Sequence, residues 1–121
     1  MAKRENVVKK KSYDFALGII KLYTDLVENK KEYVLSKQLL RSGTAVGALV
    51  REAEHAESRK DFLHKMNIAL KEANETEYWL ELLRDSQLIT KDSVESFLPQ
   101  ISELLKLLTS IVKTTKVGLH R

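Results

Sequence analysis

The fold is decided by residues 61–83, whose sequence is DFLHKMNIALKEANETEYWLELL. Apolar or small side chains recur in this stretch at intervals of three and four residues, which is the spacing of one face of an α-helix. Ser58 precedes the stretch and Asp61 follows three residues later, an arrangement that caps the start of a helix. We therefore expect a helix that begins near residue 58 and buries Phe62, Met66, Ala69, Ala73, Thr76, Leu80 and Leu83.

Three further segments repeat this amphipathic spacing. The first has Ser12 as its expected N-cap and its stripe at Phe15, Ile19, Leu22 and Leu26. The second spans residues 32–56, with its seam at Leu35, Leu39, Ser42, Val46, Leu49 and Ala53. The last spans residues 91–115 after Thr90 as its expected cap, with its seam at Val94, Phe97, Ile101, Leu104, Leu108 and Ile111. Pro99 predicts a kink or a new helix start, because proline lacks the backbone donor that a helix interior needs.

The connections near residues 29–31, 57–60 and 86–90 are only a few residues long. Short connections make sequential helices antiparallel neighbours. With one proline and four glycines, the chain has little turn chemistry for a many-stranded sheet. We expect an all-α, antiparallel, up-down-up-down four-helix bundle over residues 12–116, with a basic N-terminal tail (1–11) and a C-terminal tail (117–121).

The composition narrows the classes of function. The chain has no cysteine, which excludes disulfides, thiolate catalysis and cysteine-ligated zinc and agrees with a reducing compartment. It has no signal-peptide core, and no apolar run approaches the roughly 18 residues that span a bilayer. Phosphate-binding loops, nucleophile elbows and clustered Ser, His and Asp are also missing. We expect a cytoplasmic protein that needs no cofactor, does not enter a membrane and is not an enzyme.

The net charge of +4 is unevenly distributed. Residues 1–11 hold five basic and one acidic residue, residues 106–121 hold four basic and no acidic residues, and residues 12–105 hold 12 basic and 16 acidic residues. The expected topology would bring the two basic segments together at one end. Basic clusters suit phosphate contacts, although lysine-rich tails can also be merely solubilising ends. The expected nucleic-acid-binding residues are Lys9, Lys10, Lys11, Lys113 and Lys116, with Arg41 and Arg51 as the next candidates.

Two apolar seams are wider than a bundle core requires. The first expected helix adds Ala16, Ile20, Tyr23 and Val27 beside its stripe, and the last adds Leu98, Leu105 and Val112. These residues either broaden the core face or form an apolar surface that pairs subunits, as large exposed apolar patches do.

Gly43 and Gly47 lie four residues apart inside the second expected helix. Each glycine costs about 1 kcal/mol relative to alanine in a helix interior, so some interaction must offset the pair. Close packing against a neighbouring helix would do so, and so would close approach of a nucleic-acid backbone or a ligand.

Glu72 and Glu75 lie three residues apart on the third expected helix, so they are candidate ligands for a metal ion. A ferritin-like di-metal site needs Glu-x-x-His motifs on two helices, and only Glu52 and His55 have that spacing. We therefore expect no metal site. An ion pair of Glu72 or Glu75 with Arg41 or another basic residue, within or between subunits, is the more ordinary role for these carboxylates.

Two motifs in the second and third expected helices resemble a known family. They are QLLRSGTAVGA at residues 38–48 and IALKEANETEYWL at residues 68–80. From Ser12 to about Lys116 the chain resembles the 23S rRNA intervening-sequence proteins, and the motif residues are Arg41, Gly43, Gly47, Glu72, Glu75 and Trp79. It departs from the family at Ala45, where serine is common, and at Leu49, where asparagine is common, which puts any polar function there in doubt.

The resemblance implies a small bacterial four-helix bundle, encoded in some cases inside 23S rRNA genes, with members that assemble as homopentamers. The family is similar to the accessory protein of diversity-generating retroelements, a basic pentameric bundle that binds nucleic acid and a reverse transcriptase. No catalytic role is implied. We therefore expect a homo-oligomer, with a pentamer favoured. We expect it to bind nucleic acid, with RNA favoured over DNA. The alternative is a scaffold that binds a partner protein through its lateral helix faces.

Overall fold

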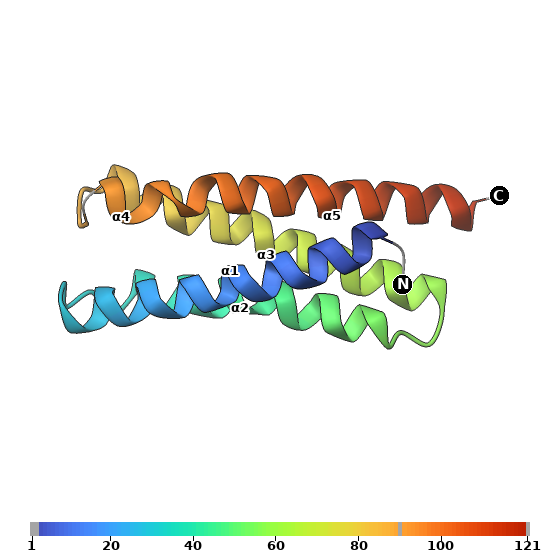
Figure 1. Ribbon diagram of the computed structural model, residues 1–121, viewed down its shortest axis with the longest axis horizontal. Helices are drawn as coiled ribbons and strands as arrows, with labels where there is room; N and C mark the ends of the chain where they lie inside the picture. The colour runs from blue at the N-terminus through green and yellow to red at the C-terminus, as the bar shows by residue number, and fades with distance from the viewer. Residues whose placement is uncertain (1–2, 90, 121) are drawn as a thin grey trace.

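The computed structural model of the chain describes residues 3–89 and 91–120. Within these residues it contains helices and no strand. The helices are α1 (Lys3–Glu28), α2 (Leu35–Glu54), α3 (Arg59–Asp85), α4 (Lys91–Glu95) and α5 (Phe97–Leu119). The short α4 and the long α5 follow one another along the fourth arm of a bundle (Figure 1). The expected all-α four-helix bundle is confirmed.

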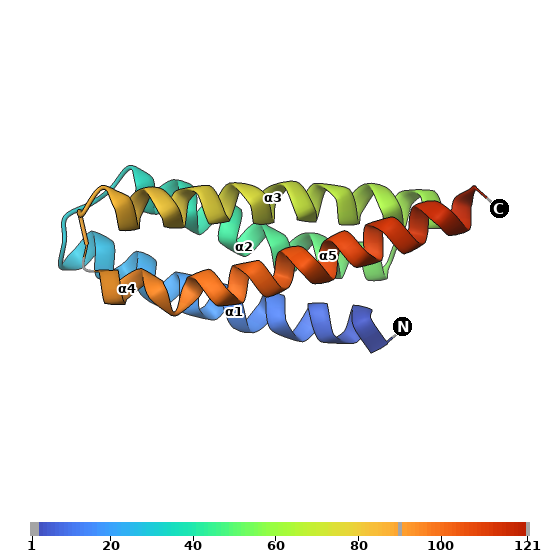
Figure 2. The same cartoon turned by 90° about the horizontal axis from the view of Figure 1, so that it is seen from above.

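The direction of the chain reverses at each connection between the arms (Figures 1 and 2). α1 packs against α2 and α5, and α3 packs against the same two helices from the other side. The start of α1 and the end of α5 therefore lie at one end of the bundle, which also carries the connection between α2 and α3 (Figure 2). We call this end the open end.

The predicted seams form the core. Every seam residue predicted for α1 and for α3 is buried, and most of those on α2, α4 and α5 are buried with them. Leu35, Leu49 and Phe97 are half-buried and pack against this core from its edge. Ser58 caps α3 as predicted, because its hydroxyl accepts a hydrogen bond of 3.0 Å from the backbone N–H of Asp61.

The prediction of an N-terminal tail over residues 1–11 was wrong for the part that the structure describes. α1 begins at Lys3, and Ser12 is a buried residue inside the helix whose hydroxyl donates to the carbonyl of Lys9. The reason is Val8, which lies seven residues before Phe15 and continues the buried stripe by two turns. Because lysines follow Val8 directly, the charge of this segment indicated a solvent-exposed tail instead of a further part of the helix.

The C-terminal boundary also differs, since α5 runs to Leu119 and leaves little of the predicted tail at 117–121. At the fourth arm, the break falls at Ser96 and α5 starts at Phe97, so the new helix start predicted from Pro99 is confirmed.

Two helix starts remain to be compared with the sequence. The expected cap Thr90 lies outside the described residues. α2 begins at Leu35, because the carboxylate of Glu32 accepts hydrogen bonds from the backbone N–H groups of Val34, Leu35 and Ser36.

The two wider apolar seams have different positions in the structure. On α5, Val112 is buried while Leu98 and Leu105 pack against the core, so this seam broadens the core face. On α1, Ile20 remains 45% exposed, and the neighbouring Tyr13 and Leu17 are 49% and 46% exposed. These three residues follow one another at helical spacing along the outer face of α1. We call them the α1 outer stripe.

Candidate nucleic-acid interface

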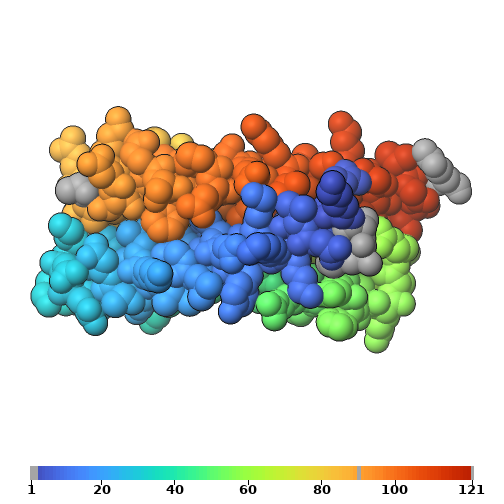
Figure 3. All heavy atoms as spheres, viewed as in Figure 1, coloured from blue at the N-terminus to red at the C-terminus, as the bar shows by residue number. Residues whose placement is uncertain are grey.

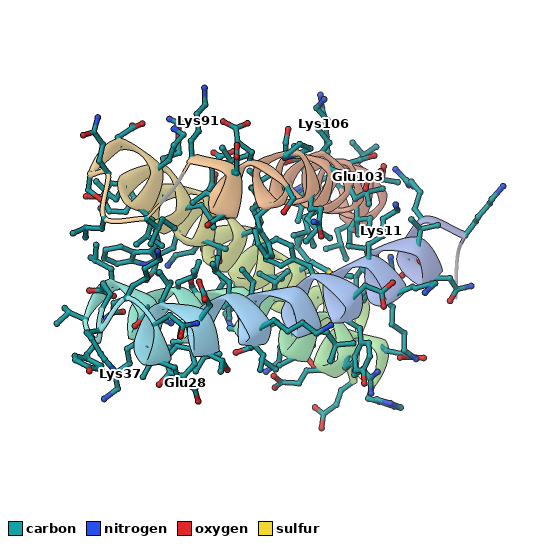
Figure 4. The ribbon with its side chains drawn as sticks, turned by 60° about the vertical axis from the view of Figure 1, so that its left-hand side comes forward. Lys11, Glu28, Lys37, Lys91, Glu103 and Lys106 are labelled. Atoms are coloured by element: carbon teal, nitrogen blue, oxygen red, sulfur yellow. The ribbon has the colours of Figure 1, made fainter. Side chains whose placement is uncertain are left out.

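The seam between α1 and α5 brings the two basic segments of the sequence together. Residues 4–11 of α1 lie along residues 103–114 of α5, as the space-filling view shows (Figure 3). The guanidinium group of Arg4 donates hydrogen bonds to the hydroxyls of Ser110 and Thr114, the latter at 3.3 Å. Lys11 crosses the same seam to Glu103, with 3.0 Å between Nζ and Oε1 (Figure 4). The two segments are therefore neighbours in space.

Each of the three predicted lysines of α1 forms an ion pair. Lys9 pairs with Glu54 of α2 at 2.7 Å, and Lys10 pairs with Asp14 of its own helix at 2.9 Å. Lys11 pairs with Glu103 of α5. A phosphate that binds these lysines must therefore compete with a carboxylate of the same chain.

The predicted lysines of α5 are in a different situation. Lys113 and Lys116 are exposed on the last turns of the helix and form no ion pair with the residues that the structure describes. Lys106 lies two turns before Lys113 on the same side of the helix and points away from the bundle (Figure 4). These three cations form an open row, which we call the α5 lysine row.

The two arginines of α2 lie on different faces. Arg51 places its guanidinium group over the ring of Tyr13, with 5.1 Å from Cζ to the ring centroid, which is a cation–π contact. It therefore adds positive charge beside α1 near the open end. Arg41 turns to α3 and takes no part in this basic region, so the structure separates it from the other predicted site residues.

Arg41 forms the centre of a network on the α2/α3 face. Its guanidinium group donates to Glu72 at 2.9 Å and also to Glu75, and the indole N–H of Trp79 donates to Glu75 at 3.2 Å. The hydrogen bond from Arg41 lowers the pKa of Glu75 and outweighs the opposite effect of burial. The ion pair predicted from the motif is therefore present within one chain, where one arginine faces two carboxylates.

Gly43 and Gly47 pack against α1. A Cβ atom on Gly43 would lie 3.0 Å from the Cγ2 of Ile19, and one on Gly47 would lie 3.3 Å from the backbone oxygen of Ser12. Both distances are tighter than ordinary van der Waals contact. The helix-packing interpretation therefore accounts for the two glycines, of which Gly43 is buried and Gly47 half-buried against α1.

Other kinds of site have little support among the described residues. No group of three or more His, Asp or Glu side chains at residues 3–89 and 91–120 is placed to hold a metal ion. None of the helices in this part of the chain is long and apolar enough to cross a membrane. Every buried side-chain nitrogen or oxygen that the structure describes has a hydrogen-bond partner.

Sequence reasoning missed the partners of the basic residues. Arg4 contacts residues more than 100 positions away, and Glu54 and Glu103 lie on two different helices. Nothing local in the sequence marks such contacts, because a glutamate on a helix surface is usually solvated. The predicted topology brought the two basic segments to one end of the bundle, but the tail predicted for residues 1–11 left their partners on α2 and α5 unpredicted.

The fold and this surface together define a small all-α four-helix-bundle protein with a basic open end. The chain matches the family model of the 23S rRNA-intervening sequence protein over residues 4–110. It belongs to this family. A solved structure, that of a protein with unknown function from the S23 ribosomal protein family of Bacteroides thetaiotaomicron, is similar to it with 58% identity and a TM-score of 0.88. The alignment covers 91% of this chain and 98% of that one. No curated protein matches the chain.

Proposed function

We propose that the protein is a non-catalytic, homo-oligomeric bundle that binds nucleic acid, RNA before DNA, through the basic surface at its open end. The observation that carries the proposal is the α5 lysine row, since Lys113 and Lys116 are exposed cations that no carboxylate of the described chain neutralises. Lysines of this kind contact phosphates without reading the base sequence, which fits binding governed by the nucleic-acid backbone.

The charge of the rest of the bundle supports the choice of this end. Residues 72–89 and 91–102, which include the second half of α3, α4 and the start of α5, carry seven acidic and two basic residues. They lie toward the opposite end of the bundle (Figure 1). A polyanion is repelled there and attracted to the open end, so the field of the whole molecule orients the approach of RNA.

The homo-oligomeric part of the proposal rests on the α1 outer stripe. An apolar stripe of this kind on the surface of a small bundle is typical of a subunit interface. The family resemblance favours five subunits. A closed ring would repeat the basic open end in every subunit, and simultaneous contacts along one RNA chain would raise its avidity without any new type of contact.

The experiment compares two variants that lose the same charge. Lys113→Gln with Lys116→Gln removes two cations from the α5 lysine row, whereas Lys30→Gln with Lys31→Gln removes two exposed cations from the α1–α2 connection at the opposite end. We expect the first variant to bind a fluorescein-labelled oligouridylate more weakly than the wild type, in a fluorescence anisotropy titration, and the second to bind almost as well. Equal losses in the two variants would contradict a specific surface at the open end.

The alternative function is a scaffold that binds a partner protein through the α2/α3 face. It is favoured by Tyr78, which is 54% exposed beside Trp79, with 5.2 Å between the two ring centroids. Aromatic residues next to an arginine are typical of protein interfaces. Wild-type protein that fails to bind RNA or DNA even at low salt would favour this alternative.

A further inference from the structure

The N-terminal turns of α1 contact the bundle through buried Val8, through hydrogen bonds of Arg4 and through two ion pairs. Among residues 3–11, Val8 is fully buried and Val7 is half-buried, while every other side chain is charged or polar. Lys9 ties this segment to α2 through Glu54, and Lys11 ties it to α5 through Glu103. The segment is therefore fastened to both neighbouring helices by carboxylates.

Both ion pairs are partly open to solvent. The side chains of Lys9 and Glu54 are 37% and 28% exposed, and those of Lys11 and Glu103 are 44% and 53% exposed. An exposed ion pair is weak and is screened by salt. A polyanion that presents several phosphates gains far more from the release of its counterions than one such pair contributes. The lysines are thus held loosely enough for phosphates to displace their carboxylates.

We infer that Glu54 and Glu103 act as internal substitutes for phosphate, which occupy Lys9 and Lys11 in the free protein and are displaced when nucleic acid binds. This inference rests on the proposed function and adds a regulatory contact to it. The carboxylates neutralise two of the cations at the open end, so they weaken binding of nucleic acid and restrict it to ligands that can outcompete both pairs. The α5 lysine row is free from the start and provides the first contact.

The electrostatics of Glu54 agree with this role. The hydrogen bond from Lys9 lowers the pKa of Glu54, with further lowering from the positive charges of Lys9 and Arg51. The carboxylate therefore stays ionised and keeps its hold on Lys9 throughout the neutral range. The carboxylate of Glu54 consequently has the same charge and the same kind of acceptor atom as a phosphate oxygen.

The test measures affinity for oligouridylate, by fluorescence anisotropy over a series of salt concentrations, in two variants of equal charge. Glu54→Gln with Glu103→Gln releases both lysines. Glu28→Gln with Glu57→Gln removes two exposed carboxylates that form no ion pair with the described residues, so it controls for the general gain in positive charge. Thermal unfolding of each variant verifies that the bundle is intact.

We expect the Glu54 and Glu103 variant to bind more tightly than the control, by up to about fivefold for each pair released. Its log-log salt slope should stay close to that of the wild type, because Lys9 and Lys11 contact phosphates in both complexes once the carboxylates are displaced. Adding Lys9→Gln and Lys11→Gln to the same variant should remove the gain, because the two sets of substitutions act through the same contacts.

The outcomes separate the two proposals. If the wild type binds oligouridylate and both glutamate variants gain affinity equally, the phosphate-substitute role of Glu54 and Glu103 is wrong while the proposed function stands. If neither the wild type nor any variant binds, the proposed function fails and the inference fails with it. A gain that persists after Lys9→Gln and Lys11→Gln would also overturn the inference.

Discussion

Single residues at the contact between α1 and α2 determine how closely the two helices approach. Gly43 and Gly47 leave room for Ile19 and for the backbone at Ser12, and this close approach stabilises the bundle enough to offset two glycines in a helix interior. The same contact buries Ile19 completely. The glycines are thus required by packing. Each lowers the helix propensity at its own position, and the contact with α1 offsets this loss.

Replacing Gly43 or Gly47 by leucine should destabilise the protein by about 1 to 3 kcal/mol, because the added volume meets Ile19 or the backbone of Ser12. Urea unfolding at fixed protein concentration measures the effect. Gly118→Leu is the matched control, since a Cβ atom at Gly118 meets nothing within 4 Å. Unchanged stability in both core variants would show that the two glycines have another purpose.

The Arg41 network makes stability depend on pH in a defined direction. Because Arg41 lowers the pKa of Glu75 in the folded state, this contribution is present above the ordinary pKa of a glutamate, about 4.5, and is lost as the pH falls through the folded value. Arg41→Gln should therefore reduce the free energy of unfolding at neutral pH by up to about 1 kcal/mol. The difference from the wild type should disappear in acid. A difference that is constant between neutral pH and acid would contradict the ion-pair explanation.

At the scale of elements, the apolar period predicted four arms and their core faces, because a helix buries one face wherever it packs. It also identified the break near Pro99. What it did not predict is where α1 begins, since the five basic residues of the first 11 suggested a tail while the single residue Val8 extends the core. The ion pairs of Lys9 and Lys11 depend on that extension, so they could not be predicted either.

Pro99→Ala should allow α4 and α5 to join. In a continuous helix, the ring of Pro99 would clash with the carbonyl four residues earlier, at Glu95, and the helix is interrupted at Ser96. Ser96 already has helical dihedral angles (φ −70°, ψ −22°), so the change is expected in backbone hydrogen bonding, which amide hydrogen exchange at residues 96–99 would report. Fast exchange that stays unchanged in the variant would mean that Pro99 does not cause the break.

For the whole molecule, the exposed surfaces have separate expected roles. The α1 outer stripe is the expected subunit contact, and the open end is the expected nucleic-acid contact. The α2/α3 face holds the Arg41 network. The α1 outer stripe adjoins the open end at Tyr13, which Arg51 contacts, while Leu17 and Ile20 lie farther along α1. Substitutions at Leu17 and Ile20 are therefore expected to affect assembly, and substitutions in the α5 lysine row to affect RNA binding.

Leu17→Glu with Ile20→Glu should convert the proposed oligomer into a monomer, because two charges would have to be buried in an apolar contact. Light scattering at micromolar concentration measures the change in mass, and circular dichroism verifies that the helices remain. Val34→Glu with Leu88→Glu is the control, since these exposed apolar residues lie in connections at the opposite end of the bundle. A wild type that is already monomeric under these conditions would contradict the assembly proposal.

The most direct test of nucleic-acid binding at the open end is the salt dependence of RNA affinity. Wild-type protein is compared with a variant in which Lys9, Lys10, Lys11, Lys113 and Lys116 are replaced by glutamine. We expect weaker binding to all RNA sequences alike and a log-log slope that is flatter by up to about 0.7 for each lysine removed. Binding that survives all five substitutions with its slope unchanged would contradict the account and place the nucleic-acid surface elsewhere on the bundle.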